Sequence, residues 1–169
     1  MSREAVQTAR GEWTPPSAIE RRNLLRRART IAVVGASGNP ARASYFVLTY
    51  LRSSSARFEI WPVNPKGGEV LGLPTYPSLG DVPATPDIVV AFRRAVDLPE
   101  VAEQAVEADA GAFWAQLGLH SDAAVRTAYE AGLQVVTNRC VKIEHARFQG
   151  GLHLAGFNTG VISSKRTRG

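Results

Sequence analysis

The chain has 169 residues, of which 44% are hydrophobic and 21% charged, and its formal net charge is +5 at pH 7. This length suits one domain with a sizeable core, and the composition excludes a disordered or fibrous protein. No apolar stretch approaches the roughly 20 residues of a membrane span, and the polar N-terminus lacks the apolar core of a signal peptide. The single cysteine, Cys140, cannot form an internal disulfide. Because such cysteine usage suits a reducing compartment, we expect a cytoplasmic protein.

Three parts are expected along the chain. Residues 1–16 are polar and end in two prolines, so we predict a flexible leader. Residues 17–148 carry the periodic apolar pattern of one folded domain. Residues 149–169 form a glycine-rich tail, for which no pattern favours a particular structure.

The first predicted helix follows a capping box of Ser17 and Glu20 and runs to about Arg29. Its expected apolar face consists of Ile19, Leu24, Leu25 and Ala28. The same helix carries Arg21, Arg22, Arg26, Arg27 and Arg29. This basic cluster can attract polyanions, including nucleic acid. A solvated helix face is the simpler interpretation, because no aromatic residues interleave with the arginines as an RNA-binding surface requires.

Strands and helices alternate over the rest of the domain. Short apolar runs predict strands at 30–35, 57–63, 86–92, 111–118 and 133–138. Helical periodicity predicts helices at 43–53, 97–110 and 121–132, and the segment 64–85 is expected to be an irregular connection with a helical turn near 78–81. Because the strands are continuously apolar, they indicate a parallel sheet covered on both faces. We therefore expect an α/β fold, a single-domain Rossmann-like doubly wound parallel sheet of about five strands.

The turn after the first strand reads GASGNPAR, residues 35–42. In doubly wound sheets, ligands bind at the carboxyl ends of the strands, and the next helix offers its positive N-terminus. Gly35 permits a tight turn, while the small Ala36, Ser37 and Gly38 let backbone N–H groups approach a phosphate. We predict a phosphate-binding turn here, with a plain strand-to-helix connection as the alternative. It departs from the dinucleotide fingerprint G-x-G-x-x-G, because Ser37 and Pro40 replace the second and third glycines.

The end of the second strand reads PVNPKGGEVLG, residues 62–72. NAD-binding folds place an acidic residue here to hold the ribose hydroxyls. This chain has the neutral Asn64 and the positive Lys66 instead. A lysine at this place favours a phosphorylated ribose, as in NADP or coenzyme A, although Lys66 by itself can equally be a solvated loop residue.

The segments IAVVGASGNPAR, PVNPKGGEVLG, YPSLGDVP, DIVVAFRRA, FWAQLG and NRCVKIEH follow one another in this order. With this set of motifs, residues 18–148 resemble the small single-domain proteins of the CoA-binding domain family. They are also similar, more distantly, to the N-terminal domain of the succinyl-CoA synthetase alpha subunit. The resemblance implies a Rossmann-like site for coenzyme A.

The resemblance also implies roles for individual residues. Gly35, Ser37, Gly38, Asn39 and Pro40 match the loop that holds the pyrophosphate, and Lys66 matches the lysine that meets the phosphorylated ribose. Val63 and Asn64 would flank the adenosine, Phe92, Arg93 and Gln116 match segments that line the site, and Arg42 would reach a phosphate. The expected cofactor site is therefore Gly35, Ala36, Ser37, Gly38, Asn39, Pro40, Arg42, Val63, Asn64, Lys66, Phe92, Arg93 and Gln116.

Catalytic signatures are missing from the sequence. It has no HxxxH or CxxC metal spacing and no GxSxG nucleophile elbow, and the histidines His120, His145 and His153 form no recognisable array. The resemblance does not extend to the domain that carries the phosphorylated histidine of succinyl-CoA synthetase, so it implies binding and no ligase chemistry. We therefore expect non-catalytic binding of coenzyme A or an acyl-CoA, with an NADP-dependent oxidoreductase as the alternative. We expect neither membrane nor nucleic acid as a partner, and a homo-oligomer or protein partner stays open.

Two further residue groups near the predicted site carry alternatives. Cys140 follows the fifth strand, and it can either form a mixed disulfide with coenzyme A, with Arg139 and Lys142 favouring the thiolate, or pack as a small residue against the sheet. Packing is the simpler interpretation. Phe113 and Trp114 are expected to pack within their strand, although Trp114 can also shape a ligand pocket.

Overall fold

Five parallel strands form the central sheet of the computed structural model, which describes residues 10–54 and 56–149. The strands are β1 (Thr30–Val34), β2 (Glu59–Val63), β5 (Ile88–Ala91), β6 (Ala112–Ala115) and β7 (Gln134–Val136), in the order β2-β1-β5-β6-β7. All neighbouring strands in this sheet are parallel. The order reverses between β1 and β5, and this switch point is where doubly wound sheets leave a crevice for a ligand. The predicted fold is confirmed.

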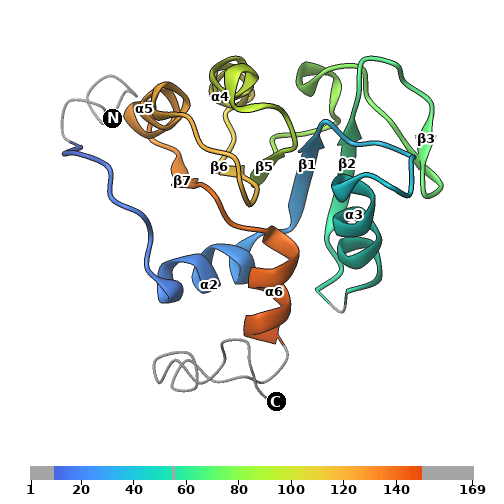
Figure 1. The fold of residues 1–169 in the computed structure, drawn as a ribbon, viewed down its shortest axis with the longest axis horizontal. Coiled ribbons are helices and arrows are strands. Elements are labelled where there is room, and N and C mark those ends of the chain that lie inside the picture. Colours follow the sequence, from blue (N-terminus) through green and yellow to red (C-terminus); the bar gives the residue numbers. More distant parts are fainter. Residues whose placement is uncertain (1–9, 55, 150–169) are drawn as a thin grey trace.

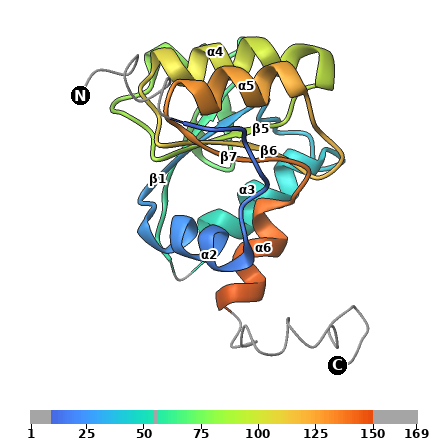
Figure 2. The ribbon, with the colours of Figure 1, turned by 90° about the vertical axis from the view of Figure 1, so that its left-hand side faces the viewer.

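Helices cover both faces of the sheet (Figures 1 and 2). One face carries α4 (Leu98–Glu107) and α5 (Asp122–Glu130), and the other carries α2 (Ala18–Arg27), α3 (Ala43–Ser53) and α6 (Val141–Gln149). Successive strand residues point to opposite faces, so Ala32 and Val34 enter one core while Ile31 and Val33 enter the other. Two cores on one sheet explain why the strands are apolar throughout.

The first helix differs from its prediction at three points. The capping box of Ser17 and Glu20 is present, but the helix ends at Arg27, because Ala28 is already extended. Ile19, which was expected on the apolar face, is 52% exposed. Arg21 is buried, so the interpretation of the arginines as a solvated helix face is wrong for this residue.

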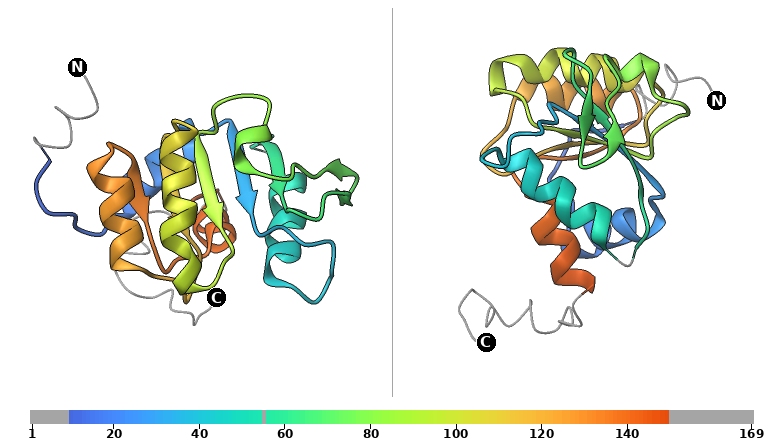
Figure 3. Two further views of the ribbon diagram at one scale, coloured as in Figure 1. Left: turned by 90° about the horizontal axis from the view of Figure 1, so that it is seen from above. Right: turned by 90° about the vertical axis from the view of Figure 1, so that its right-hand side faces the viewer.

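The connection between residues 64 and 85 contains a β-hairpin that the sequence analysis did not predict. β3 (Glu69–Val70) and β4 (Leu73–Pro74) pair antiparallel at the margin of the molecule, as the green segment of Figure 3 shows. Leu71 and Gly72 both have positive φ, 53° and 78°, as a type I′ turn requires. The expected helical turn is present as the 3₁₀ helix η1 (Leu79–Asp81).

The sequence pattern also did not predict the helix α6. Its buried residues Val141, Glu144 and His145, with the partly buried Phe148, follow the i, i+3, i+4, i+7 spacing of one helical face. Two of these four positions carry ionisable residues, so the face is not recognisable as apolar. The helix packs against α2 and α3 on the same side of the sheet.

The ends of the chain are described only in part. Within the leader, the indole nitrogen Nε1 of Trp13 donates to the backbone oxygen of Val135 at 3.2 Å, and the Arg10 guanidinium lies 3.8 Å from the centre of the Tyr129 ring. Residues 1–9 and the tail from residue 150 onward, including His153, lie outside the described residues, so the domain boundaries stay a prediction. In the described part, no helix combines the length and apolar character needed to cross a membrane.

Candidate functional site

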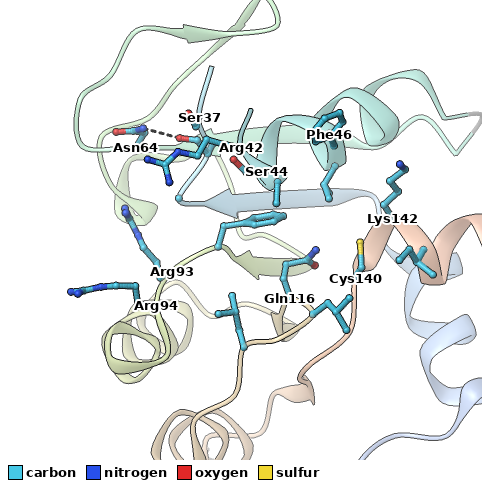
Figure 4. A pocket seen from close by; sticks show the side chains of 18 of the residues that line it. Ser37, Arg42, Ser44, Phe46, Asn64, Arg93, Arg94, Gln116, Cys140 and Lys142 are labelled. Atoms are coloured by element: carbon cyan, nitrogen blue, oxygen red, sulfur yellow. Dashed lines mark hydrogen bonds between the residues drawn. The ribbon is translucent and has the colours of Figure 1, made fainter. Parts of the chain in front are cut away.

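A pocket of about 920 Å³ opens at the carboxyl ends of β1 and β5, where the strand order reverses (Figure 4). Its volume lies within the ~300–1,000 Å³ range of small-molecule sites. We call it the switch-point pocket. Five chain segments line it, namely Gly35–Ser37 with Arg42–Ser44, Phe46 and Val47; Asn64–Lys66; Phe92–Arg94; Gln116, Leu117 and Leu119; and Cys140, Lys142 and Ile143.

Most of the predicted site residues meet in this pocket. Those that line it are Gly35, Ala36, Ser37, Arg42, Asn64, Lys66, Phe92, Arg93 and Gln116. Gly38, Asn39, Pro40 and Val63 do not line it. Val63 is buried in the core at the end of β2, and the other three lie in the outer part of the β1–α3 turn. Contact of any of these residues with a ligand stays a prediction.

Gly35 holds the turn against the neighbouring strand. Its φ is +90°, and a Cβ built there would lie 2.2 Å from the backbone oxygen of Phe92. The N–H groups of Gly35 and Ala36 both donate to the Val63 oxygen, at 3.0 and 3.3 Å. These two N–H groups are therefore already hydrogen-bonded to the end of β2. Glycine is required here by the packing of the backbone rather than by the approach of a phosphate.

The N–H groups with no acceptor lie further along the same segment. Within the described residues, no group accepts from the N–H of Ser37, Gly38, Ala43 or Ser44. Arg42 is the N-cap of α3 and makes no side-chain cap bond, so the N–H groups of Ala43 and Ser44 in the first turn of this helix have no partner among the described residues, while that of Tyr45 donates to the Arg42 oxygen at 3.1 Å. Ser44 is 3% exposed, and its hydroxyl has no hydrogen-bond partner in the described part of the chain. Such donors at a helix N-terminus favour an anion.

Asn64 ties the two loops of the pocket together. Its Nδ2 donates to the Ala36 oxygen at 2.7 Å, and its Oδ1 accepts from the N–H of Lys66 at 2.8 Å. The amide is thus used in holding the backbone in place. The side chain of Lys66 is exposed at the rim, and no partner for its ammonium group is found among the described residues.

The charges that line the switch-point pocket are all positive. They belong to Arg42, Lys66, Arg93, Arg94 and Lys142. In the described part of the chain, only Arg94 has a carboxylate partner, Asp97 at 3.1 Å. No aspartate or glutamate lines the pocket. Uncompensated cations around one cavity concentrate anionic ligands there.

The inner wall comes from β6 and the start of α6. Gln116 is 4% exposed, and its Oε1 accepts from the N–H of Val141 at 3.0 Å, which attaches the first turn of α6 to the sheet. Half-buried Cys140 packs against the core and also lines the pocket, so its position is compatible with both interpretations given above. Trp114 is fully buried and donates from Nε1 to the Arg139 oxygen at 2.8 Å, which confirms strand packing.

Neither of the described histidines lines the switch-point pocket. His120 contacts Thr137 and Asp122 at 2.9 and 2.7 Å near the start of α5. His145 is buried, its Nδ1 lies 2.7 Å from the Tyr50 hydroxyl, and burial lowers its pKa. In the part of the chain that is described, no group of three His, Cys, Asp or Glu side chains is placed to hold a metal.

The chain matches a known protein family over most of its length. The model of the CoA binding domain matches residues 29–146. The chain belongs to the CoA-binding domain family. The predicted family is thereby confirmed over most of the described residues, including every segment that lines the switch-point pocket.

Relatives of the whole domain share its size. The uncharacterized protein YneT of Bacillus subtilis is 42% identical over 131 residues, which are 78% of this chain and 96% of that protein. A hypothetical protein from Pyrococcus horikoshii OT3 has a solved structure with a TM-score of 0.76 and 37% identity, covering 83% of this chain and 100% of its own. A Thermus thermophilus structure gives a TM-score of 0.73 and 33% identity, covering 79% and 99%.

Larger relatives contain a similar segment. Acetate–CoA ligase (ADP-forming) II of Archaeoglobus fulgidus is 30% identical over 103 residues, which are 60% of this chain but only 15% of the ligase. The chain therefore corresponds to a small part of that enzyme.

Proposed function

We propose that this protein binds coenzyme A or one of its acyl thioesters in the switch-point pocket and catalyses no reaction of its own. Membership of the CoA-binding domain family supports the choice of ligand. The observation that carries the proposal is the charge of the pocket, where five cations meet unpaired N–H donors and no carboxylate. Coenzyme A is a polyanion with a pyrophosphate and a 3′-phosphate, so it matches this surface.

The positions of the donors suggest how the ligand lies. The pyrophosphate would contact the N–H groups between Ser37 and Ser44, with Arg42 at its side. Lys66 would meet the 3′-phosphate of the ribose. The pantetheine arm would pass Gln116 toward Cys140, at the opposite end of the pocket from Arg93 (Figure 4).

The experiment compares coenzyme A, 3′-dephospho-CoA, NADP and NAD by thermal shift and calorimetry. A ligand present at 100 times its Kd adds about 2.7 kcal/mol to the free energy of unfolding, which is readily detected. Stabilisation by coenzyme A but not by NAD supports the proposal. Stabilisation by NADP alone would favour an oxidoreductase instead, because Lys66 can equally meet a 2′-phosphate.

The variant Lys66→Ala tests the orientation. It should weaken coenzyme A by about two- to fivefold, as expected for an exposed ion pair, and leave 3′-dephospho-CoA unchanged. Arg126→Ala removes an exposed cation of α5 outside the pocket and serves as the charge control. Equal losses for both ligands would remove Lys66 from the phosphate site. Release of free thiol from acetyl-CoA by the wild-type protein would contradict the absence of catalysis.

A further inference from the structure

Large apolar side chains gather at the mouth of the switch-point pocket. The exposed large hydrophobic residues of the described chain are Ile19, Phe46, Val96, Leu117 and Ile143. Three of them, Phe46, Leu117 and Ile143, line this one pocket, with exposed fractions of 58%, 63% and 47%. Single exposed apolar residues are ordinary, but a cluster around a cavity marks a binding surface. We call these three residues the apolar rim.

The apolar rim lies at the end of the pocket that holds Cys140 and Lys142, away from Asn64 and Arg93. Figure 4 shows Phe46, Cys140 and Lys142 on one side, with Asn64 and Arg93 on the other. Ile143 follows Lys142 in α6, and Leu117 follows the pocket residue Gln116, so the rim draws on α3, α6 and the β6–α5 loop. One end of the pocket is therefore cationic, while the other combines the apolar rim with a single cation, Lys142.

We infer that the apolar rim binds the acyl group of an aliphatic acyl-CoA, so that the protein prefers such a thioester to free coenzyme A. This inference rests on the proposed function, which places the nucleotide at the charged end and the sulfur near Cys140. A chain that continues beyond the sulfur meets Phe46, Leu117 and Ile143, and its burial also covers these side chains. Free coenzyme A would leave the rim exposed to water.

Lys142 is the charged residue that lines the pocket at this end. A long lysine side chain can lay its methylene groups along an apolar surface and keep its ammonium group in water. The same ammonium could pair with the second carboxylate of a dicarboxylic acyl group. The apolar surface of three large side chains outweighs this single exposed charge, so we expect an aliphatic chain to bind more tightly than a succinyl group.

The first test measures Kd by calorimetry for coenzyme A and for its acetyl, butyryl, hexanoyl and succinyl thioesters. Full burial of one methylene strengthens binding by about fourfold, and a half-exposed rim should give about twofold. Hexanoyl-CoA should therefore bind at least about tenfold more tightly than acetyl-CoA. Equal affinities along the series, or succinyl-CoA as the tightest ligand, would overturn the inference. If coenzyme A itself does not bind, the proposed function fails instead.

The second test assigns the gain to the rim. In Phe46→Ser and Ile143→Ser, the ratio of the acetyl-CoA Kd to the hexanoyl-CoA Kd should fall to about two. Ile19→Ser replaces an isoleucine of similar exposure on α2 that does not line the pocket, and should keep the wild-type ratio. Phe46→Trp retains an apolar rim but fills more of it, so it should favour butyryl-CoA over hexanoyl-CoA. Wild-type ratios in all three rim variants would refute the assignment.

A second copy of the chain is the other occupant to consider. Light scattering with and without saturating hexanoyl-CoA separates the two cases. A monomer in both conditions agrees with an acyl site. A dimer that persists with the ligand, and that Phe46→Ser dissociates, would show that the rim is a subunit interface.

Discussion

Gly35 shows how a single residue sets the geometry of the site. The sequence identified it as the glycine of a tight turn, and its positive φ agrees with that prediction. The stronger requirement is the backbone oxygen of Phe92, which occupies the space that a Cβ would need. Because these two residues follow the neighbouring strands β1 and β5, Gly35 allows the two edges of the pocket to come together.

The variant Gly35→Ala should therefore lose about 3 kcal/mol or more of unfolding free energy, from the clash together with the positive φ. Urea unfolding of the free protein measures this loss. Gly38→Ala is the matched control, because a Cβ there meets only the Glu69 oxygen at an ordinary 3.7 Å. An equal loss in the two variants would contradict the assignment of the close approach to Gly35.

At the scale of elements, α6 is attached to the rest of the fold by polar contacts as well as by its apolar residues Val141 and Phe148. Arg21 of α2 donates from Nε to Oε1 of Glu144 at 2.6 Å, and its NH1 donates to the Pro16 oxygen at 2.7 Å. Both side chains of the ion pair are almost fully buried. On the other side, His145 contacts the Tyr50 hydroxyl and the ring of Phe58. The helix is thus fixed between α2 and α3.

Removing one member of the buried pair should be costly. Glu144→Leu leaves the Arg21 guanidinium buried without its carboxylate, and should lower the unfolding free energy by about 3–5 kcal/mol. The double variant Arg21→Leu/Glu144→Leu should lose less than the sum of the single variants, because no fully buried charge is left without its partner; Arg139 and Arg147, which also lie 3.5 and 3.7 Å from Glu144, are partly exposed to water. A double-mutant cycle from urea unfolding provides the test. Additive losses would indicate that the two side chains do not interact energetically.

The contact of α6 with α3 should respond to pH. Burial lowers the pKa of His145 below its usual value near 6.5, so the unfolded chain binds a proton more readily than the folded one. The unfolding free energy should then fall as the pH drops below about 6.5, with a slope of at most about 1.4 kcal/mol per pH unit. The polar and charged groups that face His145 are the Tyr50 hydroxyl and, around a small cavity that His145 also lines, Arg22, Arg26 and Arg29.

Urea unfolding between pH 7.5 and 5.5 measures this slope. In His145→Asn, an amide stands near the position of Nδ1 and cannot titrate, so the slope in this window should decrease. An unchanged slope in the variant would assign the pH dependence to other groups.

At the scale of the whole molecule, the net charge of +5 and the one-sided charge of the pocket act together. Salt screens such an attraction, so the Kd for coenzyme A should rise several-fold between about 50 and 500 mM NaCl. The rise should be smaller for 3′-dephospho-CoA, which carries fewer negative charges. Calorimetry at four salt concentrations gives both slopes. Equal slopes would mean that the 3′-phosphate stays outside the field of these cations.

Short-range periodicity explains which features of the fold could be predicted from the sequence alone. Continuous apolar runs such as Ile31–Val34 and Ile88–Ala91 require burial on both faces, and this predicts a parallel sheet between two layers of helices. The same pattern, in which an apolar strand, a glycine and small residues follow one another, predicted a phosphate-binding turn, and Gly35, Ala36 and Ser37 of this turn line the switch-point pocket. The motif order then gave the family, which the family comparison confirmed.

The buried face of α6 and the apolar rim depend instead on contacts between segments that lie far apart in the sequence. The helical face of α6 contains Glu144 and His145, and it is recognisable as buried only when Arg21 and Tyr50 are placed opposite them. Similarly, Phe46, Leu117 and Ile143 look like unrelated surface residues in the sequence. Their gathering around one pocket depends on the crossing of three elements, and such contacts between distant segments leave no periodic trace in the chain.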